Sequence, residues 1–137
     1  MRRVTADTNI LVSALIYKRG KPFQRLRMAL EGEIRLAVSA EIIAETLDVL
    51  SRKFGIKREE LPEYKEAIES AASTVHPTVE LNVIKHDPPD NRILECAVSS
   101  GSEFILTGDK DLLRLGNYDS IRIVTVAAFL EAPRPER

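Results

Sequence analysis

Apolar positions along the 137-residue chain follow two spacings, and each spacing predicts a different kind of element. Short continuous apolar runs are typical of strands buried in a parallel sheet, whereas apolar residues three and four positions apart are typical of one face of a helix. The short runs predict strands at residues 2–6, 35–38, 79–83, 103–107 and 121–124. The helical spacing predicts helices at residues 8–16, 22–31, 40–54, 57–74, 88–101, 109–114 and 125–130.

Residues at the expected helix ends support two of these limits. Ser39 is a suitable N-cap for helix 40–54, and Gly55 follows directly after its last turn. Pro62 lies inside the charged segment 57–74, where a proline removes a backbone hydrogen bond. We therefore expect Pro62 to divide that helix.

Strands that alternate with helices indicate parallel pairing, with helices on both faces of the sheet. The predicted fold class is therefore α/β, as a three-layer α/β/α sandwich with a mainly parallel central sheet. No internal repeat or long linker divides the sequence, so residues 1–131 are expected to form a single domain. Pro133 and Pro135 mark residues 132–137 as a flexible C-terminal tail.

Composition narrows the class of protein without naming a partner. Hydrophobic residues make up 44% of the chain and charged residues 30%, which is ordinary for a soluble globular protein. The single cysteine, Cys96, cannot form an internal disulfide and favours a reducing compartment. No apolar stretch approaches the ~20 residues of a membrane helix, and the chain start lacks the features of a secretory signal. We expect a cytoplasmic protein with no membrane partner.

A basic turn after the first expected helix contains Lys18, Arg19 and Lys21. The formal net charge of −1 neither supports nor excludes nucleic-acid binding, because binding depends on a local basic surface. These three side chains are candidates for contact with an RNA backbone. The alternative, a turn that is merely solvated, stays open.

Two acidic residues come soon after expected strands. Asp7 follows strand 2–6, and Asp109 follows strand 103–107. In open parallel sheets, ligands bind at the carboxyl ends of the strands, where the chain turns into the next helix. Each aspartate can instead be an N-cap of the helix that comes after it. For either residue taken alone, both interpretations remain open.

Two further acids are indicated by helical geometry, at about 100° per residue. In helix 88–101, Asp90 falls on the apolar arc, although a position near the helix start also suits a third-position capping carboxylate. That arc contains Ile93, Leu94, Ala97 and Val98, and the opposite, solvated side contains Arg92, Glu95 and Ser99. In helix 40–54, Glu45 lies just outside an apolar arc that ends at Phe54, and a solvated surface acid is its alternative role.

The case for a functional site rests on the four acids together. Close carboxylates without a counter-charge repel one another and raise one another's pKa values. No histidine, lysine or arginine in these segments is evidently placed to neutralise them. A hard, oxygen-bound cation removes the repulsion, and Mg²⁺ in proteins is typically held by a few carboxylates and water. The candidate ligands of a Mg²⁺ or Mn²⁺ site are therefore Asp7, Glu45, Asp90 and Asp109.

The motifs around these acids resemble those of PIN domains, in the same order along the chain. The first is Asp7-Thr8-Asn9-Ile10-Leu11, and the second is Ser39 followed by Glu45. The third is Asp90-Asn91-Arg92-Ile93-Leu94-Glu95-Cys96-Ala97, and the fourth is Thr107-Gly108-Asp109-Lys110-Asp111-Leu112-Leu113. The resemblance spans about residues 3–130, and the fourth motif is more specific than the first two.

This resemblance implies a Mg²⁺- or Mn²⁺-dependent endoribonuclease that hydrolyses RNA phosphodiester bonds with a metal-activated water. It makes all four acids catalytic, with Asp7 and Asp90 as direct ligands, Glu45 as a group that positions water and Asp109 as a ligand through water. Many short bacterial and archaeal members are VapC-type toxins that pair with an antitoxin and often dimerise. The expected partners are therefore RNA, an antitoxin and a second copy of the chain.

Four further residues are expected to assist the acids. They are Thr8, Asn9, Thr107 and Asp111. The first three can orient carboxylates or phosphate by hydrogen bonds, as groups behind metal ligands do elsewhere. Asp111 is expected to be a helix-dipole partner or a distant auxiliary ligand.

The nuclease has two alternatives: a non-catalytic module with the same fold, and another Mg²⁺-binding α/β class such as a receiver or a phosphohydrolase. A catalytically silent PIN-like module would bind RNA or protein with the same fold, but intact acids disfavour it. A receiver would need an aspartate after a middle strand, where Ser39 stands. A phosphohydrolase would need a second aspartate two residues after the first, where Asn9 stands.

Overall fold

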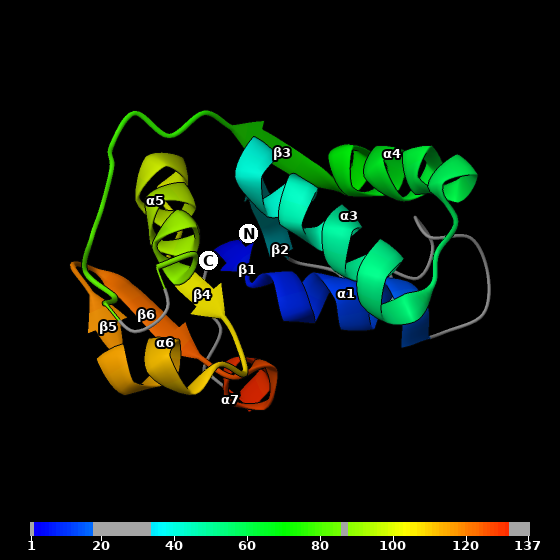
Figure 1. Ribbon diagram of the computed structural model, residues 1–137. Coiled ribbons are helices and arrows are strands. Elements are labelled where there is room, and N and C mark those ends of the chain that lie inside the picture. Colours follow the sequence, from blue (N-terminus) through cyan, green and yellow to red (C-terminus); the bar gives the residue numbers. More distant parts are fainter. Residues whose placement is uncertain (1, 18–33, 86–87, 132–137) are drawn as a thin grey trace.

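The computed structural model of the chain describes residues 2–17, 34–85 and 88–131 (Figure 1). Its strands are β1 (Arg2–Ala6), β2 (Ile34–Ser39), β3 (Ala72–Val75), β4 (Phe104–Leu106), β5 (Asn117–Tyr118) and β6 (Ile121–Val124). Its helices are α1 (Thr8–Tyr17), α3 (Ala40–Phe54), α4 (Leu61–Ala71), α5 (Asp90–Ser100), α6 (Lys110–Leu115) and α7 (Val126–Glu131), with a 3-10 turn η1 (Arg58–Glu60). The predicted helix 22–31 and the tail 132–137 lie outside the described residues.

The six described strands form one sheet in the order β3-β2-β1-β4-β6-β5. Neighbouring strands are parallel except for β5, which pairs antiparallel with β6. This arrangement confirms the prediction of a mainly parallel α/β sheet. The short strand β5 was not predicted, because its two residues are too few to show an alternating pattern.

Successive residues of β1 show that helices cover both faces of the sheet. Thr5 Oγ1 lies 3.8 Å from Cys96 Sγ of α5 on one face. Its neighbour Val4 packs with Leu106 and with Phe129 of α7 on the other face. The sheet therefore separates α5 from α7, as Figure 1 shows, and the three-layer prediction is confirmed.

The main hydrophobic core joins α1, α3, α4 and α5 to the sheet. Fully buried side chains from each of these helices meet in it, among them Leu11, Ile42, Ile68 and Leu94. Burial of each such side chain stabilises the fold by roughly 1.5–3 kcal/mol before entropy is considered. Among the described helices, none has the length and apolar character needed to cross a membrane.

The limits of α3 agree with the sequence. Ser39 Oγ accepts a hydrogen bond from the Ile42 N–H (3.3 Å), and Gly55 ends the helix with a left-handed φ of 66°. Phe54, expected on the apolar arc, is instead 48% exposed. It lies in the last turn, where helical periodicity still holds but the helix has passed the edge of the core.

The segment predicted as a helix over 57–74, divided at Pro62, forms η1, α4 and β3. Pro62 lies in the first turn of α4, not in the middle of a helix. In a first turn the missing N–H of proline costs no helical hydrogen bond. Residues 72–75 form the edge strand β3, paired parallel with β2. Pairing with a distant strand has overridden the local helical pattern.

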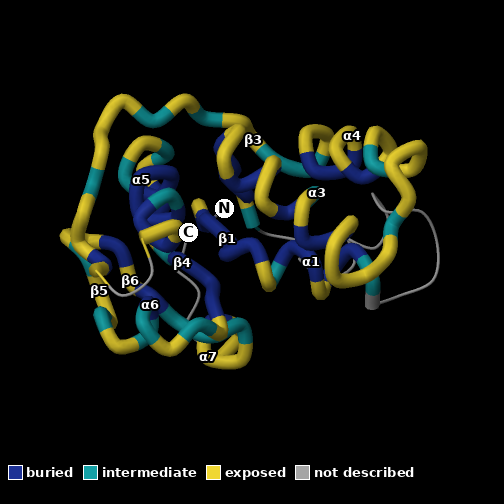
Figure 2. Tube along the Cα trace, in the orientation of Figure 1, coloured by how far each residue is buried: buried dark blue, intermediate teal, exposed yellow. Residues whose placement is uncertain are grey.

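Residues 79–83 do not form a strand, contrary to the sequence prediction. They belong to the β3–α5 connection, by which we mean residues 76–89. This connection passes the outer side of α5 and is exposed or intermediate over most of its described length (Figures 1 and 2). The N–H groups of Val83 and Ile84 both donate to Asn91 Oδ1, at 2.9 Å each. Backbone groups satisfied by a side chain do not need a neighbouring strand.

Glu95 of α5 was expected on the solvated side but is buried, at 6% exposure. The β3–α5 connection covers it, and Glu95 Oε2 accepts from the Leu81 N–H (2.7 Å). The same oxygen accepts from Arg92 Nη2 (2.6 Å), which supplies a counter-charge for the buried carboxylate. The helical wheel missed this burial because the covering segment is not part of the sheet.

Candidate acidic metal centre

The sheet reverses its order between β1 and β4, which lie side by side. After β1 the chain continues to β2 on one side, and after β4 it continues to β6 on the other. Ligands of open α/β sheets bind outside the carboxyl ends of the strands at this reversal. Asp7 directly follows β1, and its N–H donates to the carbonyl of Leu106, the last residue of β4 (2.9 Å).

Asp7 is buried at this point, with 5% of its surface exposed. Burial raises the pKa of its carboxyl group, and the nearby charge of Asp109 raises it further. Hydrogen bonds from Thr107 and from the backbone of Asn9 and Thr8 work in the opposite direction without cancelling the shift. The structure thus places Asp7 where a negative charge is electrostatically costly.

Thr107, which is fully buried, connects Asp7 to Asp109. Its hydroxyl donates to Asp7 Oδ2 (2.6 Å) and accepts from the Asp109 N–H (2.9 Å). Asp109 Oδ2 in turn accepts from the Leu112 N–H (3.0 Å) and caps α6. Asp109 is therefore both a helix cap and part of the acidic edge, so the two interpretations of this residue are compatible.

Asp90 is buried, as its place on the apolar arc predicted. It is the first residue of α5 rather than a third-position capping residue, because the N-cap position belongs to Pro89. The far end of α5 lies at the amino edge of the sheet, where Arg3 Nε donates to the Gly101 carbonyl (2.7 Å). The first turn of α5 consequently lies at the carboxyl edge, on the same side as Asp7.

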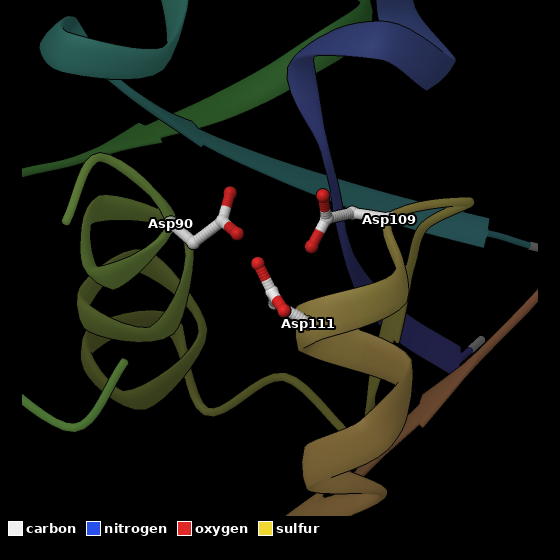
Figure 3. Close-up of side chains that lie close together, drawn as sticks. All are labelled: Asp90, Asp109 and Asp111. Carbon is white, nitrogen blue, oxygen red and sulfur yellow. The ribbon is translucent and has the colours of Figure 1, made fainter. Parts of the chain in front are cut away.

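Asp90, Asp109 and Asp111 form a cluster of three carboxylates, which we call the acidic trio. One oxygen from each residue lies within 4.8 Å of those of the other two. Figure 3 shows the side chains of the first turns of α5 and α6 pointing toward one another. Because both helices present their N-termini, their dipoles favour negative charge there.

Asp111 takes a more central place than the sequence suggested. It was expected as a dipole partner or a distant auxiliary ligand, yet it belongs to the trio. Asp109 and Asp111 are two residues apart and share the first turn of α6, so both can reach α5. Asp111 also has a counter-charge, because Arg114 Nη1 lies 3.1 Å from its Oδ1.

The other two predicted acids lie outside the trio. Asp7 is linked to the trio by its hydrogen bond from Thr107, and the charge of Asp109 raises the pKa of the Asp7 carboxyl group. Glu45 is exposed on the second turn of α3 and is not a member of the trio. Its convergence on this edge stays a prediction.

The assisting residues divide in the same way. Thr107 makes the hydrogen bonds described above. Thr8 is 2% exposed, and its Oγ1 has no hydrogen-bond partner among the described residues. Asn9 is exposed, and Lys18, Arg19 and Lys21 lie outside the described residues. Cys96 is buried in the core, where burial raises its thiol pKa to about 11.

The acidic trio fits a small divalent cation by chemistry and by size. Mg²⁺ prefers hard oxygen ligands at about 2.1 Å, so oxygens in its shell lie roughly 3 to 4.2 Å apart. The trio spans up to 4.8 Å, and small side-chain rotations would close this gap. The buried Thr8 hydroxyl, two residues after the end of β1, has no hydrogen-bond partner among the described residues. These residues can therefore hold Mg²⁺ or Mn²⁺.

Comparisons with known proteins agree with this geometry. The sequence pattern of the PIN domain family matches residues 3–111, a stretch that begins in β1 and ends at the third member of the trio. The uncharacterized protein MJ1680 of Methanocaldococcus jannaschii is 32% identical over 117 residues, which cover 82% of this chain and 74% of that protein.

Three solved structures share the fold, each with a TM-score of 0.59. Mycobacterium tuberculosis VapC20, a toxin that cleaves the sarcin-ricin loop, is 16% identical and aligns over 87% of this chain and 98% of its own. Rickettsia felis VapBC2, bound to a fragment of promoter DNA, is 14% identical over 88% and 96%. VapBC-1 of nontypeable Haemophilus influenzae is 20% identical over 90% and 97%. The sequence match over most of the chain and the order of the acids on this sheet together show that the chain belongs to the PIN domain family.

Proposed function

We propose that this PIN-domain protein is a Mg²⁺- or Mn²⁺-dependent endoribonuclease. The acidic trio supports the proposal most directly, because it lies at the reversal point of the sheet beside the buried Asp7. A stable fold has no need for three close carboxylates there, since like charges repel without a cation. A divalent ion would bind the acidic trio, and an RNA phosphate would bind beside it at the carboxyl edge of the sheet.

Each acid has a proposed role in phosphodiester hydrolysis. Asp90, Asp109 and Asp111 would hold the ion from the N-terminal ends of α5 and α6, and Asp7, at the end of β1, would be a further ligand. Thr107 would hold the orientation of the Asp7 carboxylate through the hydrogen bond from its hydroxyl to Oδ2. When bound, a divalent ion supplies hydroxide near neutral pH and offsets the charge that develops on the phosphate.

The names of the proteins that share the fold support a proposal about partners. VapC20 is a toxin that cleaves the sarcin-ricin loop, and the other two structures are VapBC2 and VapBC-1. We propose by analogy that this chain is the toxin of a toxin–antitoxin pair, forms a homodimer and cleaves cytoplasmic RNA. The alternative is a catalytically silent PIN-like module that binds RNA or protein.

Cleavage of labelled RNA separates these functions. The purified protein is incubated with a labelled structured RNA in Mn²⁺ and in EDTA, beside Asp90→Asn and Asp48→Asn. Asp48 is an exposed acid of α3 that pairs with Arg52, so its variant controls for the loss of one negative charge. We expect cleavage in Mn²⁺ by the unchanged protein and by Asp48→Asn, and a loss of at least about 100-fold in Asp90→Asn. Metal-independent RNA binding without cleavage would favour the silent module.

Glu45 is tested within the same assay. If Glu45 positions the attacking water, Glu45→Gln should lower kcat while Mn²⁺ affinity stays close to that of the unchanged protein. A fall in Mn²⁺ affinity would make Glu45 a ligand instead. Unchanged kcat and Mn²⁺ affinity would mean that Glu45 is only a solvated surface acid of α3.

A further inference from the structure

Asn91, next to Asp90 in the first turn of α5, is almost completely buried, with 1% of its surface exposed. Its Oδ1 accepts from the N–H groups of Val83 and Ile84, at 2.9 Å each. Its Nδ2 donates to the carbonyls of Ile84 (2.9 Å) and Pro88 (3.0 Å). An amide has two donor hydrogens and two acceptor lone pairs, so these four bonds use its whole capacity.

These bonds join the start of α5 to two places in the β3–α5 connection, residues 83–84 and residue 88. The helix has no side-chain N-cap, because Pro89 occupies that position. Val83 and Ile84 lie before the turn, and Pro88 lies within it, so one side chain fixes all three to the start of the helix. Ile84 is itself buried in the main core, which anchors the connection from the other side. The position of the first turn of α5 therefore depends on Asn91.

Asp90 lies inside that first turn and supplies one carboxylate of the acidic trio. The other two come from α6, which the sheet positions independently through β4 and β6. The distance between the two helix starts thus decides whether the three oxygens can share an ion. On the α5 side, Ile93 and Leu94 pack in the core, and Asn91 ties the start of the helix to the β3–α5 connection by its four side-chain hydrogen bonds.

Glu95 offers an internal comparison, since it holds the same connection at a different place. It is buried to a similar degree and accepts from the Leu81 N–H (2.7 Å). It lies five positions beyond Asp90, more than one helical turn away. Loss of Glu95 removes the Leu81 bond and the ion pair with Arg92 but leaves the four Asn91 hydrogen bonds intact, so it should loosen the connection with a smaller effect on Asp90 than loss of Asn91.

We propose that Asn91 is a positioning residue of the acidic metal centre, acting by fixing Asp90 opposite Asp109 and Asp111. This inference rests on the proposed metal-dependent function. Groups that orient metal ligands typically contribute 10- to 100-fold to metal affinity or activity. A purely structural Asn91 would affect folding stability and leave the affinity for the ion unchanged.

The test compares Asn91→Ala with Glu95→Ala in the full-length chain. Mn²⁺ affinity is measured by calorimetric titration, thermal unfolding is measured in EDTA, and kcat and KM are measured with labelled RNA. Both variants should melt at lower temperature than the unchanged protein. Asn91→Ala alone should bind Mn²⁺ about 10-fold or more weakly, with a lower kcat and a nearly unchanged KM. Asn91→Ser, which keeps one donor and one acceptor, gives the same comparison if Asn91→Ala does not fold, and should show an intermediate loss of affinity.

Mn²⁺ affinity that is unchanged in Asn91→Ala or Asn91→Ser, or reduced equally in Glu95→Ala, would overturn the positioning role. Asp90→Asn keeps this failure separate from failure of the proposed function. If Asp90→Asn binds Mn²⁺ as tightly as the unchanged protein, the acidic trio is not the metal centre and both proposals fall. If Asp90→Asn binds weakly while Asn91→Ala binds normally, the metal centre stands and only the role of Asn91 is lost.

Discussion

The hydroxyl of Thr107 donates to Asp7 Oδ2 at 2.6 Å, across 100 positions of sequence. Thr107 Oγ1 also accepts a hydrogen bond from the Asp109 N–H at 2.9 Å. One buried side chain therefore sets the relative positions of the acids that follow β1 and β4. A network in which every member has a partner holds its groups more rigidly than separate bonds would.

Replacement of Thr107 by valine should disturb this link while preserving shape. Asp7 would lose its hydroxyl donor, and the part-buried backbone N–H of Asp109 would lose its acceptor, at a cost of about 1–3 kcal/mol in the free energy of unfolding. Mn²⁺ affinity should fall about 10- to 100-fold, as measured by calorimetric titration. Thr107→Ser retains the hydroxyl and should restore most of the affinity. Equal losses in the serine and valine variants would contradict the prediction, because Thr107→Ser keeps the hydroxyl; a loss in Thr107→Ser alone would show that the methyl group matters instead.

The raised pKa of Asp7 predicts a pH dependence in the metal-free protein. Burial comes first among its causes and the charge of Asp109 adds to it, so the folded protein binds this proton more tightly than the unfolded chain does. The contribution of Asp7 to stability should therefore fall as pH rises from 3.8 through its folded-state pKa. Asp7→Asn removes this ionisation, and its advantage in melting temperature in EDTA should grow across that window and then level off. Asp48→Asn serves as the control, and a pH-independent difference for Asp7→Asn would contradict the prediction.

Asp111 and Arg114 permit a matched pair of variants, because either change breaks their 3.1 Å ion pair. Only Asp111→Asn also removes a carboxylate from the acidic trio. A ligand at 100 times its dissociation constant stabilises a protein by about 2.7 kcal/mol. We expect Arg114→Ala to keep this Mn²⁺-dependent gain in thermal unfolding and Asp111→Asn to lose much of it. An equal Mn²⁺-dependent gain in stability in both variants would mean that Asp111 is a helix-dipole partner and not a metal ligand.

Lys18, Arg19 and Lys21 remain candidates for RNA contact on sequence grounds. If they contact the backbone, changing all three to alanine should weaken RNA binding and reduce the salt dependence of affinity by up to ~3 contacts' worth of slope. Cleavage at saturating RNA should change much less. Binding measured over a range of salt concentrations tests this, and an unaltered slope would mean that the basic turn is only solvated.

The sequence by itself determined the elements whose causes are local. Ser39 and Gly55 mark the two ends of α3, since a side-chain cap and a left-handed residue act within one helical turn. The apolar arc of α5 placed Asp90 on a buried face. Alternation of strands and helices led to the parallel sheet, and the strand-end rule directed attention to Asp7 and Asp109.

Only the tertiary structure decided which groups meet. Residues 72–75 became a strand because β2 offered an edge, and residues 79–83 did not because α5 side chains took their hydrogen bonds. Glu95 is buried by that same connection, and Asp111 joins Asp90 because two helix N-termini face each other. Periodicity and capping depend on neighbours a few residues away. Pairing, burial by a distant segment and the distance between two carboxylates depend on how the elements pack, which no single segment of the chain encodes.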